Sequence, residues 1–272
     1  MDSKLKKLNT ILKNLQSVVV AYSGGLDSTF LLKMAVDVLR KRNVLAVTAR
    51  SETYPYSEYE EAKRIAKKIG AKHLTIKTNE LRLENFKSNP VNRCYHCKKE
   101  LFKKLDGIRK KRGFSFVLDG TNIDDLKDVR YGRRAAKELL VRSPLLEAGL
   151  AKNDIRKFSK RLKLPTWDKP SFACLASRIP FGSAITKKDL GKIEIAEALL
   201  QRLGFKQVRV RSHKDIARIE VLKKDFERAI KMDELIIKKL TALGFVYITL
   251  DLCGYRTGSM HEAANHIDTA DL

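Results

Sequence analysis

Long apolar runs are missing from this 272-residue chain. No stretch approaches the ~20 consecutive apolar residues of a membrane-spanning helix, so the sequence predicts no membrane partner. The first eight residues also lack the apolar core of a signal peptide, and we expect them to form a short amphipathic helix of a cytoplasmic protein. A hydrophobic content of 43% is still enough for one or two domains with a sizeable core.

Acidic and aromatic residues are both scarce. Only 32 Asp and Glu stand against 56 Lys and Arg, which gives a formal charge of +24. Such an excess can indicate nucleic acid, but many lysines come in pairs on predicted helix faces, as on a solvated lysine-rich surface. The aromatic fraction is 7%, without the stacking clusters of single-stranded RNA sites. We therefore expect no nucleic-acid partner, and a homo-oligomer is compatible with the sequence.

The chain is organised around a polar turn between an apolar run and a helical pattern near the N-terminus. The turn and the helix start read Ser23, Gly24, Gly25, Leu26, Asp27 and Ser28. The two glycines permit backbone conformations closed to other residues, and the helix N-terminus offers free amides and a positive dipole end. No Gly-Lys-Ser/Thr follows, which excludes a Walker loop. The segment resembles the PP-loop of the ATP pyrophosphatases, which predicts that it binds ATP.

Strands alternate with helices over the first part of the chain. Apolar runs predict strands at 18–20, 44–48, 73–76 and 114–118. This alternation predicts an α/β fold with a parallel sheet covered on both faces. A second, small α+β unit follows, with helices at 186–203 and 225–243 and strands at 208–210, 217–221 and 245–250. We divide the chain into a PP-loop ATP pyrophosphatase domain, 1–167, and a C-terminal region, 168–272, which carries the candidate residues for substrate binding discussed below.

Ligands of parallel sheets bind beyond the carboxyl ends of the strands, so the residues after each strand are candidates. Gly120, Thr121 and Asn122 follow the fourth strand and are expected to meet a ribose, an adenine edge or Mg²⁺. Acidic residues continue this segment at 124, 125 and 128, although such clusters are usually caps and turns. Asp27 at the helix start is expected to hold Mg²⁺ on the departing pyrophosphate.

Cysteine is also rare, with four residues in the chain. In a cytoplasmic protein they favour metal or redox chemistry over disulfides. Cys94 and Cys97 form a CxxC that we place on a polar loop, and no second CxxC or histidine pair completes a zinc site. Together with Cys174 they could hold three corners of a 4Fe-4S cluster and leave one iron open for sulfide. Cys253 is expected to be a small buried apolar residue.

Arginines form the third candidate group. Arg209 and Arg211 are two residues apart on a predicted strand and therefore share one face. Surface solvation would explain such a pair, but a pair that faces a cleft forms forks with phosphate or carboxylate. Given the neighbouring cysteine-bearing segment, we expect Ser177, Arg178, Arg209 and Arg211 to bind an anionic substrate.

Several short segments occur in the order typical of the LarE family. They are the PP-loop, Arg-Cys-x-x-Cys-Lys (93–98), Asp-Gly-Thr-Asn (119–122), Ser-Pro-Leu (143–145), Cys-Leu-Ala-Ser-Arg (174–178) and Val-Arg-Val-Arg (208–211). The chain resembles this family over nearly its whole length. The resemblance implies an ATP-dependent sulfur transferase that acts on a small molecule, a pyridinium dicarboxylate mononucleotide, in the synthesis of the nickel-pincer nucleotide of lactate racemase.

The resemblance also implies a mechanism. A substrate carboxylate displaces Mg²⁺-bound pyrophosphate from ATP, and sulfur then attacks the acyl-adenylate. In one variant of the family a single cysteine, at the position of Cys174, gives up its own sulfur. In the other, three cysteines hold a 4Fe-4S cluster that delivers sulfide. Because a CxxC is unnecessary for the sacrificial route, we favour the cluster, and Cys174 is essential in both.

Three other functions are compatible with a PP-loop. A PP-loop tRNA thiolase would explain the positive charge, although no appended RNA-binding module is visible. A nucleotide-binding regulator without turnover would need the PP-loop but no adenylate. An amide-forming synthetase would leave the cysteines without a purpose.

Overall fold

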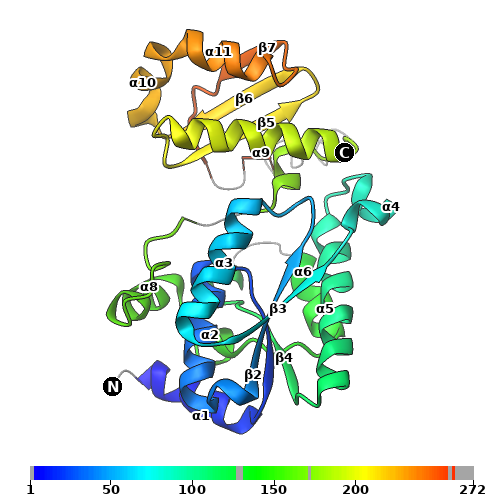
Figure 1. Ribbon diagram of the computed structural model, residues 1–272, viewed down its shortest axis with the longest axis vertical. Helices are drawn as coiled ribbons and strands as arrows, with labels where there is room; N and C mark the ends of the chain where they lie inside the picture. The colour runs from blue at the N-terminus through cyan, green and yellow to red at the C-terminus, as the bar shows by residue number, and fades with distance from the viewer. Residues whose placement is uncertain (1–2, 127–130, 171–172, 257–258, 261–272) are drawn as a thin grey trace, which may run out of the picture. The chain divides into compact units, whose positions relative to one another are not determined.

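The computed structural model describes residues 3–126, 131–170, 173–256 and 259–260 (Figure 1). The chain packs into two units, and each is interleaved in sequence with the other. The first consists of Met1–Glu80 and Asn92–Phe172, and the second of Leu81–Val91 and Ala173–Leu272. The sequence-based division after residue 167 stays a prediction.

The first unit is built on a four-stranded parallel sheet. Its strands are β1 (Val18–Ala21), β2 (Val44–Arg50), β3 (Lys72–Lys77) and β4 (Phe116–Leu118), in the order β3-β2-β1-β4. Every pair is parallel, with Val19 opposite both Leu45 and Val117. The predicted α/β class and parallel sheet are confirmed.

Helices cover both faces of this sheet (Figure 1). They are α1 (Ser3–Leu15), α2 (Leu26–Leu39), α3 (Tyr56–Ile69), α5 (Arg93–Arg112), α6 (Tyr131–Glu138), α7 (Pro144–Glu147) and α8 (Lys152–Arg161). Successive strand residues point to opposite faces. Val18 and Val20 therefore pack in the core with α1, α2 and α8, whereas Val19 packs with α5 and α6. Short 3-10 turns lie at Lys41–Asn43 and Ile123–Leu126.

The N-terminal helix is longer than expected. Leu5, Leu8, Leu12 and Leu15 recur every three or four residues along α1, and all four are buried. This spacing places them on one face of the helix, which joins the core beside α2. No helix among the described residues is long and apolar enough to cross a membrane.

The second unit contains a small mixed sheet. Strand β5 (Val208–His213) is antiparallel to β6 (Ile216–Val221), and β7 (Tyr247–Leu250) runs parallel to β6. Its helices are α4 (Glu84–Lys87), α9 (Lys187–Arg202), α10 (Phe226–Lys231) and α11 (Asp233–Thr241), with 3-10 turns at Glu80–Arg82, Leu175–Arg178 and Lys223–Asp225. Helices α9, α10 and α11 share an apolar core with the sheet. This confirms the predicted small α+β unit.

Two sequence-based expectations were wrong in detail. The helix predicted over 225–243 is interrupted at Met232, whose dihedral angles (φ −110°, ψ 16°) leave the helical region. Asp233 then begins α11, where an acidic residue is favourable in the first turn. The CxxC does not lie on a loop, because α5 begins at Arg93 and includes Cys94 and Cys97 in its first turns.

Candidate functional site

The loop between β1 and α2 has a geometry that requires glycine. Gly24 has φ +66°, and a Cβ atom built on it would lie 2.6 Å from the Cβ of Ala62 in α3. Any side chain would therefore need both an unfavourable backbone conformation and a shift of α3. The loop backbone can lie this close to α3 only with glycine at this position.

Serine hydroxyls hold the ends of the loop together. The hydroxyls of Ser23 and Ser28 lie 3.1 Å apart, and the amide of Ser23 donates to Ser28 Oγ at 3.3 Å. Gly25 is the N-cap residue of α2 and offers no side chain to the first amides of the helix, and Asp27 lies in the first turn. Amides left without such a cap are suited to phosphate oxygens.

A tyrosine that the sequence analysis did not include is hydrogen-bonded to the start of the loop. The hydroxyl of Tyr54 donates to the carbonyl of Ser23 at 2.6 Å. Burial, followed by the negative charge of Glu58, raises the pKa of Tyr54. Burial also raises the pKa of Tyr22 to about 12, so both phenols stay protonated at neutral pH. Tyr54 follows β2, so the rule of inspecting residues after each strand could have found it.

The turn after β4 packs directly against the loop. A Cβ atom on Gly120 would lie 3.1 Å from the amide nitrogen of Ser28 and 3.4 Å from the Cβ of Asp27. Asp119 stabilises the turn by accepting hydrogen bonds from the amide (3.2 Å) and hydroxyl (2.8 Å) of Thr121 and from the hydroxyl of Ser143 (2.6 Å). The structure thus brings these two predicted segments together.

Asn122 is the best candidate for a base or ribose contact in this turn. It is fully buried, and its Oδ1 accepts a hydrogen bond from the amide of Asp124 at 2.9 Å. Its Nδ2 has no hydrogen-bond partner within the described residues, and a buried donor in this state favours a ligand. Asp124 and Asp125 accept backbone hydrogen bonds, whereas Asp128 lies outside the described residues.

The cysteines form no disulfide, and all four lie within the described residues. Cys94 is exposed and Cys97 is half-buried, three residues apart on α5, which places the two side chains on one face of the helix. Cys174 is half-buried in the second unit, and Cys253 is exposed, contrary to the expected burial. Within the described residues no three His, Cys, Asp or Glu side chains gather as a metal site.

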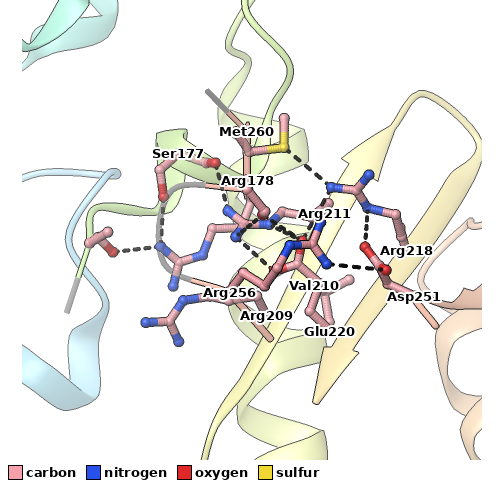
Figure 2. A network of polar contacts seen from close by, with 12 residues as sticks. Ser177, Arg178, Arg209, Val210, Arg211, Arg218, Glu220, Asp251, Arg256 and Met260 are labelled. Carbon is pink, nitrogen blue, oxygen red and sulfur yellow. Dashed lines mark hydrogen bonds and ion pairs between the residues drawn. The ribbon is translucent and has the colours of Figure 1, made fainter. Parts of the chain in front are cut away.

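Buried ion pairs organise the arginines of the second unit (Figure 2). Arg178 is bonded to Glu197 of α9, with Nε and Nη2 each 2.9 Å from a carboxylate oxygen. Arg211 of β5 is bonded to Glu220 of β6 at 3.0 and 2.8 Å. The sequence analysis missed both glutamates, whose partners lie 19 and 9 residues away in the chain.

Positive charge accumulates around Arg209. Burial, followed by the charge of Arg178, lowers the pKa of the Arg209 guanidinium. This guanidinium lies 5.4 Å from the ring centroid of Tyr255 and donates to the carbonyl of Val208 at 2.7 Å. Arg211 donates to the carbonyl of Ser177 at 2.9 Å, so the cysteine-bearing turn is attached to β5. A buried guanidinium close to other arginines favours an anionic ligand.

The strand, the glycine loop and the open helix start define a PP-loop domain of the ATP pyrophosphatase class, which uses ATP. The profile of the NAD synthase family matches residues 4–104. The pyridinium-3,5-bisthiocarboxylic acid mononucleotide synthase of Lactiplantibacillus plantarum is 38% identical over 262 residues, which are 96% of this chain and 95% of that protein. The chain belongs to the family of that synthase, the LarE family.

Two further relatives also match along almost the whole chain. An uncharacterised protein of Synechocystis sp. is 42% identical over 263 residues, which cover 96% of this chain and 98% of the relative. An uncharacterised protein of Methanocaldococcus jannaschii is 33% identical over 260 residues, covering 93% and 98%. These matches span both units, so the family assignment does not depend on the PP-loop alone.

Proposed function

We propose that this protein converts a carboxylate of a pyridinium dicarboxylate mononucleotide to a thiocarboxylate, as an ATP-dependent sulfur transferase in the synthesis of a nickel-pincer nucleotide. The observation that carries the proposal is the near full-length match to the bisthiocarboxylic acid synthase, which covers both the PP-loop and the second unit with Cys174 and its arginines. The glycine loop and the buried arginine group support an ATP step and an anionic substrate, respectively.

The first step is adenylation. A carboxylate oxygen of the substrate attacks the α-phosphorus of ATP, the bond to the β-phosphate oxygen breaks, and pyrophosphate leaves with both electrons of that bond. The amides of the 23–28 loop stabilise the phosphate charge as it develops. Thr121 and Asn122 are assigned to the nucleoside. The product is an acyl-adenylate, in which AMP is a good leaving group.

Asp27 is assigned to Mg²⁺. Asp27 lies in the first turn of α2, and its Cβ is 3.4 Å from the position that a Cβ on Gly120 would take. Carboxylate oxygen is a preferred Mg²⁺ ligand, so the donor chemistry fits. When bound, Mg²⁺ would neutralise charge on the departing pyrophosphate.

Cys174 is assigned to sulfur transfer. In the sacrificial route its thiolate attacks the acyl carbon and AMP leaves. Loss of the Cys174 α-proton and cleavage of its Cβ–S bond then give the thiocarboxylate and dehydroalanine. This sequence needs no external oxidant or reductant. It balances with one ATP and one sulfur atom per carboxylate.

We favour a second route, in which Cys94, Cys97 and Cys174 hold a 4Fe-4S cluster. The two CxxC thiols share one helix face, as adjacent cluster ligands require. When bound, the cluster would supply sulfide in place of the Cys174 sulfur. Anaerobically purified protein is expected to be brown, to contain about four iron atoms and to lose them in the Cys97→Ser variant. Colourless protein that turns over once and loses the mass of H₂S at Cys174 would contradict the cluster.

The anionic groups of the substrate are assigned to Ser177, Arg209 and Arg211. Arg178, which was expected to join them, is not assigned to the substrate because its side chain is 0% exposed and is bound to Glu197 and to the carbonyls of residues 173 and 174. The three assigned residues lie in the second unit with Arg178, and burial, followed by the charge of Arg178, lowers the pKa of Arg209. Arginine forks are suited to phosphate and carboxylate. The expected cytoplasmic location and the absence of a nucleic-acid partner stay predictions.

The central test is ATP–pyrophosphate exchange with a pyridinium dicarboxylate mononucleotide. We expect exchange that depends on this substrate, and a loss of about 10²-fold in Asp27→Asn because the metal loses a charged ligand. Thr10→Ala, which changes an exposed hydroxyl of α1, is the control. The proposal is wrong if the oxygen-protected protein releases no AMP and pyrophosphate with this substrate. Retention on tRNA at physiological salt would favour a tRNA thiolase instead.

A further inference from the structure

One arginine side chain fixes the backbone on both sides of the sulfur-bearing residue. Nη1 of Arg178 donates to the carbonyl oxygens of Ala173 (2.6 Å) and Cys174 (2.9 Å) and to the hydroxyl of Ser177 (3.0 Å). The carbonyl of Cys174 also accepts the amide of Ser177 at 3.0 Å. Cys174 is extended (φ −58°, ψ 151°) and directly precedes the turn Leu175–Arg178. The position of its Cα therefore depends on the Arg178 guanidinium.

Glu197 holds that guanidinium from the other edge. Its two carboxylate oxygens each accept a hydrogen bond of 2.9 Å from Arg178, and Oε1 also accepts the amide of Val210 at 3.0 Å. The exposed fractions of the two side chains are 0% for Arg178 and 7% for Glu197. Figure 2 shows Arg178 between Ser177 and the strand that carries Val210. Both α9 and β5 thus fix the arginine.

A buried ion pair stabilises a protein no more than a well-packed apolar pair in the same place would. Burying the two ions costs several kcal/mol each, and an apolar pair of similar volume is often equally stable or more stable. An apolar side chain at position 178 could fill the same space, but it could not donate to the carbonyl oxygens of residues 173 and 174. These hydrogen bonds are what the charged pair adds.

We propose that Arg178, oriented by Glu197, is a positioning residue that places Cys174 for the sulfur-transfer step, an inference that rests on the proposed function. Sulfur transfer needs Cys174 at a defined distance from the acyl carbon or from its iron, and misplacement of a reacting group by ~1 Å costs about 10²-fold in rate. Adenylation does not use Cys174. Its rate is therefore independent of Arg178.

The first test separates the two half-reactions in Arg178→Lys, which keeps the charge but loses the fork. We expect substrate-dependent ATP–pyrophosphate exchange to be unchanged and thiocarboxylate formation to fall about 10²-fold. A purely structural role would lower both rates together, which would overturn the proposal. Because Arg178→Lys leaves Glu197 with an imperfect partner, a second variant combines Arg178→Met with Glu197→Met. This variant removes both buried charges, and wild-type sulfur transfer in the folded protein would also overturn the proposal.

Arg109 offers a matched control in the first unit. Its Nε donates to Asp106 at 2.8 Å, and its Nη1 donates to the carbonyl oxygens of Phe114 and Ser115 at 3.4 Å each. It therefore also joins a carboxylate to two successive carbonyls, but at the C-terminal end of α5. Arg109→Lys is expected to leave both exchange and sulfur transfer unchanged.

A third measurement does not depend on the substrate. The rate at which iodoacetamide alkylates each cysteine is followed by mass spectrometry of its peptide. We expect the Cys174 rate to rise in Arg178→Lys and in the double Met variant, with the Cys253 rate as the internal reference. An unchanged Cys174 rate would show that Arg178 does not fix this residue. Absence of exchange in the unaltered protein would contradict the proposed function, and the alkylation rates would still decide the positioning role.

Discussion

The candidate site of the first unit is formed mainly by main-chain atoms, whereas that of the second unit is formed mainly by side chains. The PP-loop depends on main-chain atoms brought close together, since Gly24 lies against Ala62 and Gly120 lies against Ser28. The second unit instead depends on long, buried side chains, because Arg178 is paired with Glu197 and Arg211 is paired with Glu220. A main-chain site fails when atoms are added, whereas a side-chain site fails when charge or length is removed.

The largest expected effect is the loss of the Cys174 sulfur atom from the second unit. Cys174→Ala should abolish thiocarboxylate formation, because the sulfur or the iron ligand is lost, and should leave ATP–pyrophosphate exchange intact. The measurement is product mass beside exchange rate. Cys253→Ala, at an exposed cysteine, is the control and should be fully active. Product formation at the normal rate in Cys174→Ala would end the assignment.

The next effect tests the first unit by addition of one methyl group. Gly24→Ala is expected to lower exchange about 10²-fold, because the new Cβ would lie 2.6 Å from Ala62 and the loop must move. Gly70→Ala is the matched control, with a similar φ of +79° but nothing within 4 Å of its Cβ. It should cost about 1 kcal/mol of stability and no exchange activity. Equal losses in both would mean that backbone strain, rather than close approach, limits the loop.

A smaller effect, on stability, tests the second unit by removal of charge. Glu220 is fully buried and accepts hydrogen bonds from Arg211, from Arg218 (3.2 Å) and from Ser259 (2.8 Å). Glu220→Gln leaves a buried guanidinium without its counter-ion and should lower the free energy of unfolding by about 3–5 kcal/mol, measured by urea denaturation.

The control for Glu220→Gln is a half-exposed pair of similar geometry. Arg142 and Glu147 are also joined by two hydrogen bonds, but their side chains are 41% and 30% exposed. Solvent screens this pair, so Glu147→Gln should cost about 1 kcal/mol or less. Equal costs would mean that burial does not distinguish the second unit.

The smallest expected effect is that of removing an ordinary surface ion pair, which serves as the reference for the stability changes above. Lys33 and Asp37 form an ion pair one helical turn apart on the surface of α2. Lys33→Ala should change the free energy of unfolding by no more than about 0.5 kcal/mol, and it should leave both half-reactions unchanged. A loss above 1 kcal/mol would show that surface charge contributes more to this basic protein than an ordinary pair does.

The features that could be predicted from the sequence are those that depend on neighbouring residues. Apolar runs located the strands, and the glycine–serine segment between Val20 and Thr29 located the PP-loop, because both signals come from neighbouring residues. The start of α5 was missed because Cys94 and Cys97 lie in polar surroundings before the apolar spacing of that helix begins. The break at Met232 was missed because the apolar periodicity continues across it. Periodicity alone does not show that one helix ends and a second helix begins directly after it.

The ion pairs could not be found from pattern at all. Glu197 and Glu220 look like ordinary polar residues of a helix and a strand, and their role depends on which arginines the fold brings to them. The expectation that Arg209 and Arg211 share a face was sound, since alternate strand residues do so. Whether such a face is buried is decided by tertiary packing, which sequence spacing does not encode.

The interleaving of the two units has a practical consequence. The second unit takes Leu81–Val91 from the middle of the first, and Asn89 donates to the carbonyls of Ile179 (3.2 Å) and Pro180 (2.7 Å). A fragment that starts at residue 173 would lack these hydrogen bonds. A fragment that stops at residue 172 would contain residues 81–91 without the rest of the unit to which they belong. Dissection of this enzyme therefore requires 81–91 to be supplied with the C-terminal half, for example through a circularly permuted chain.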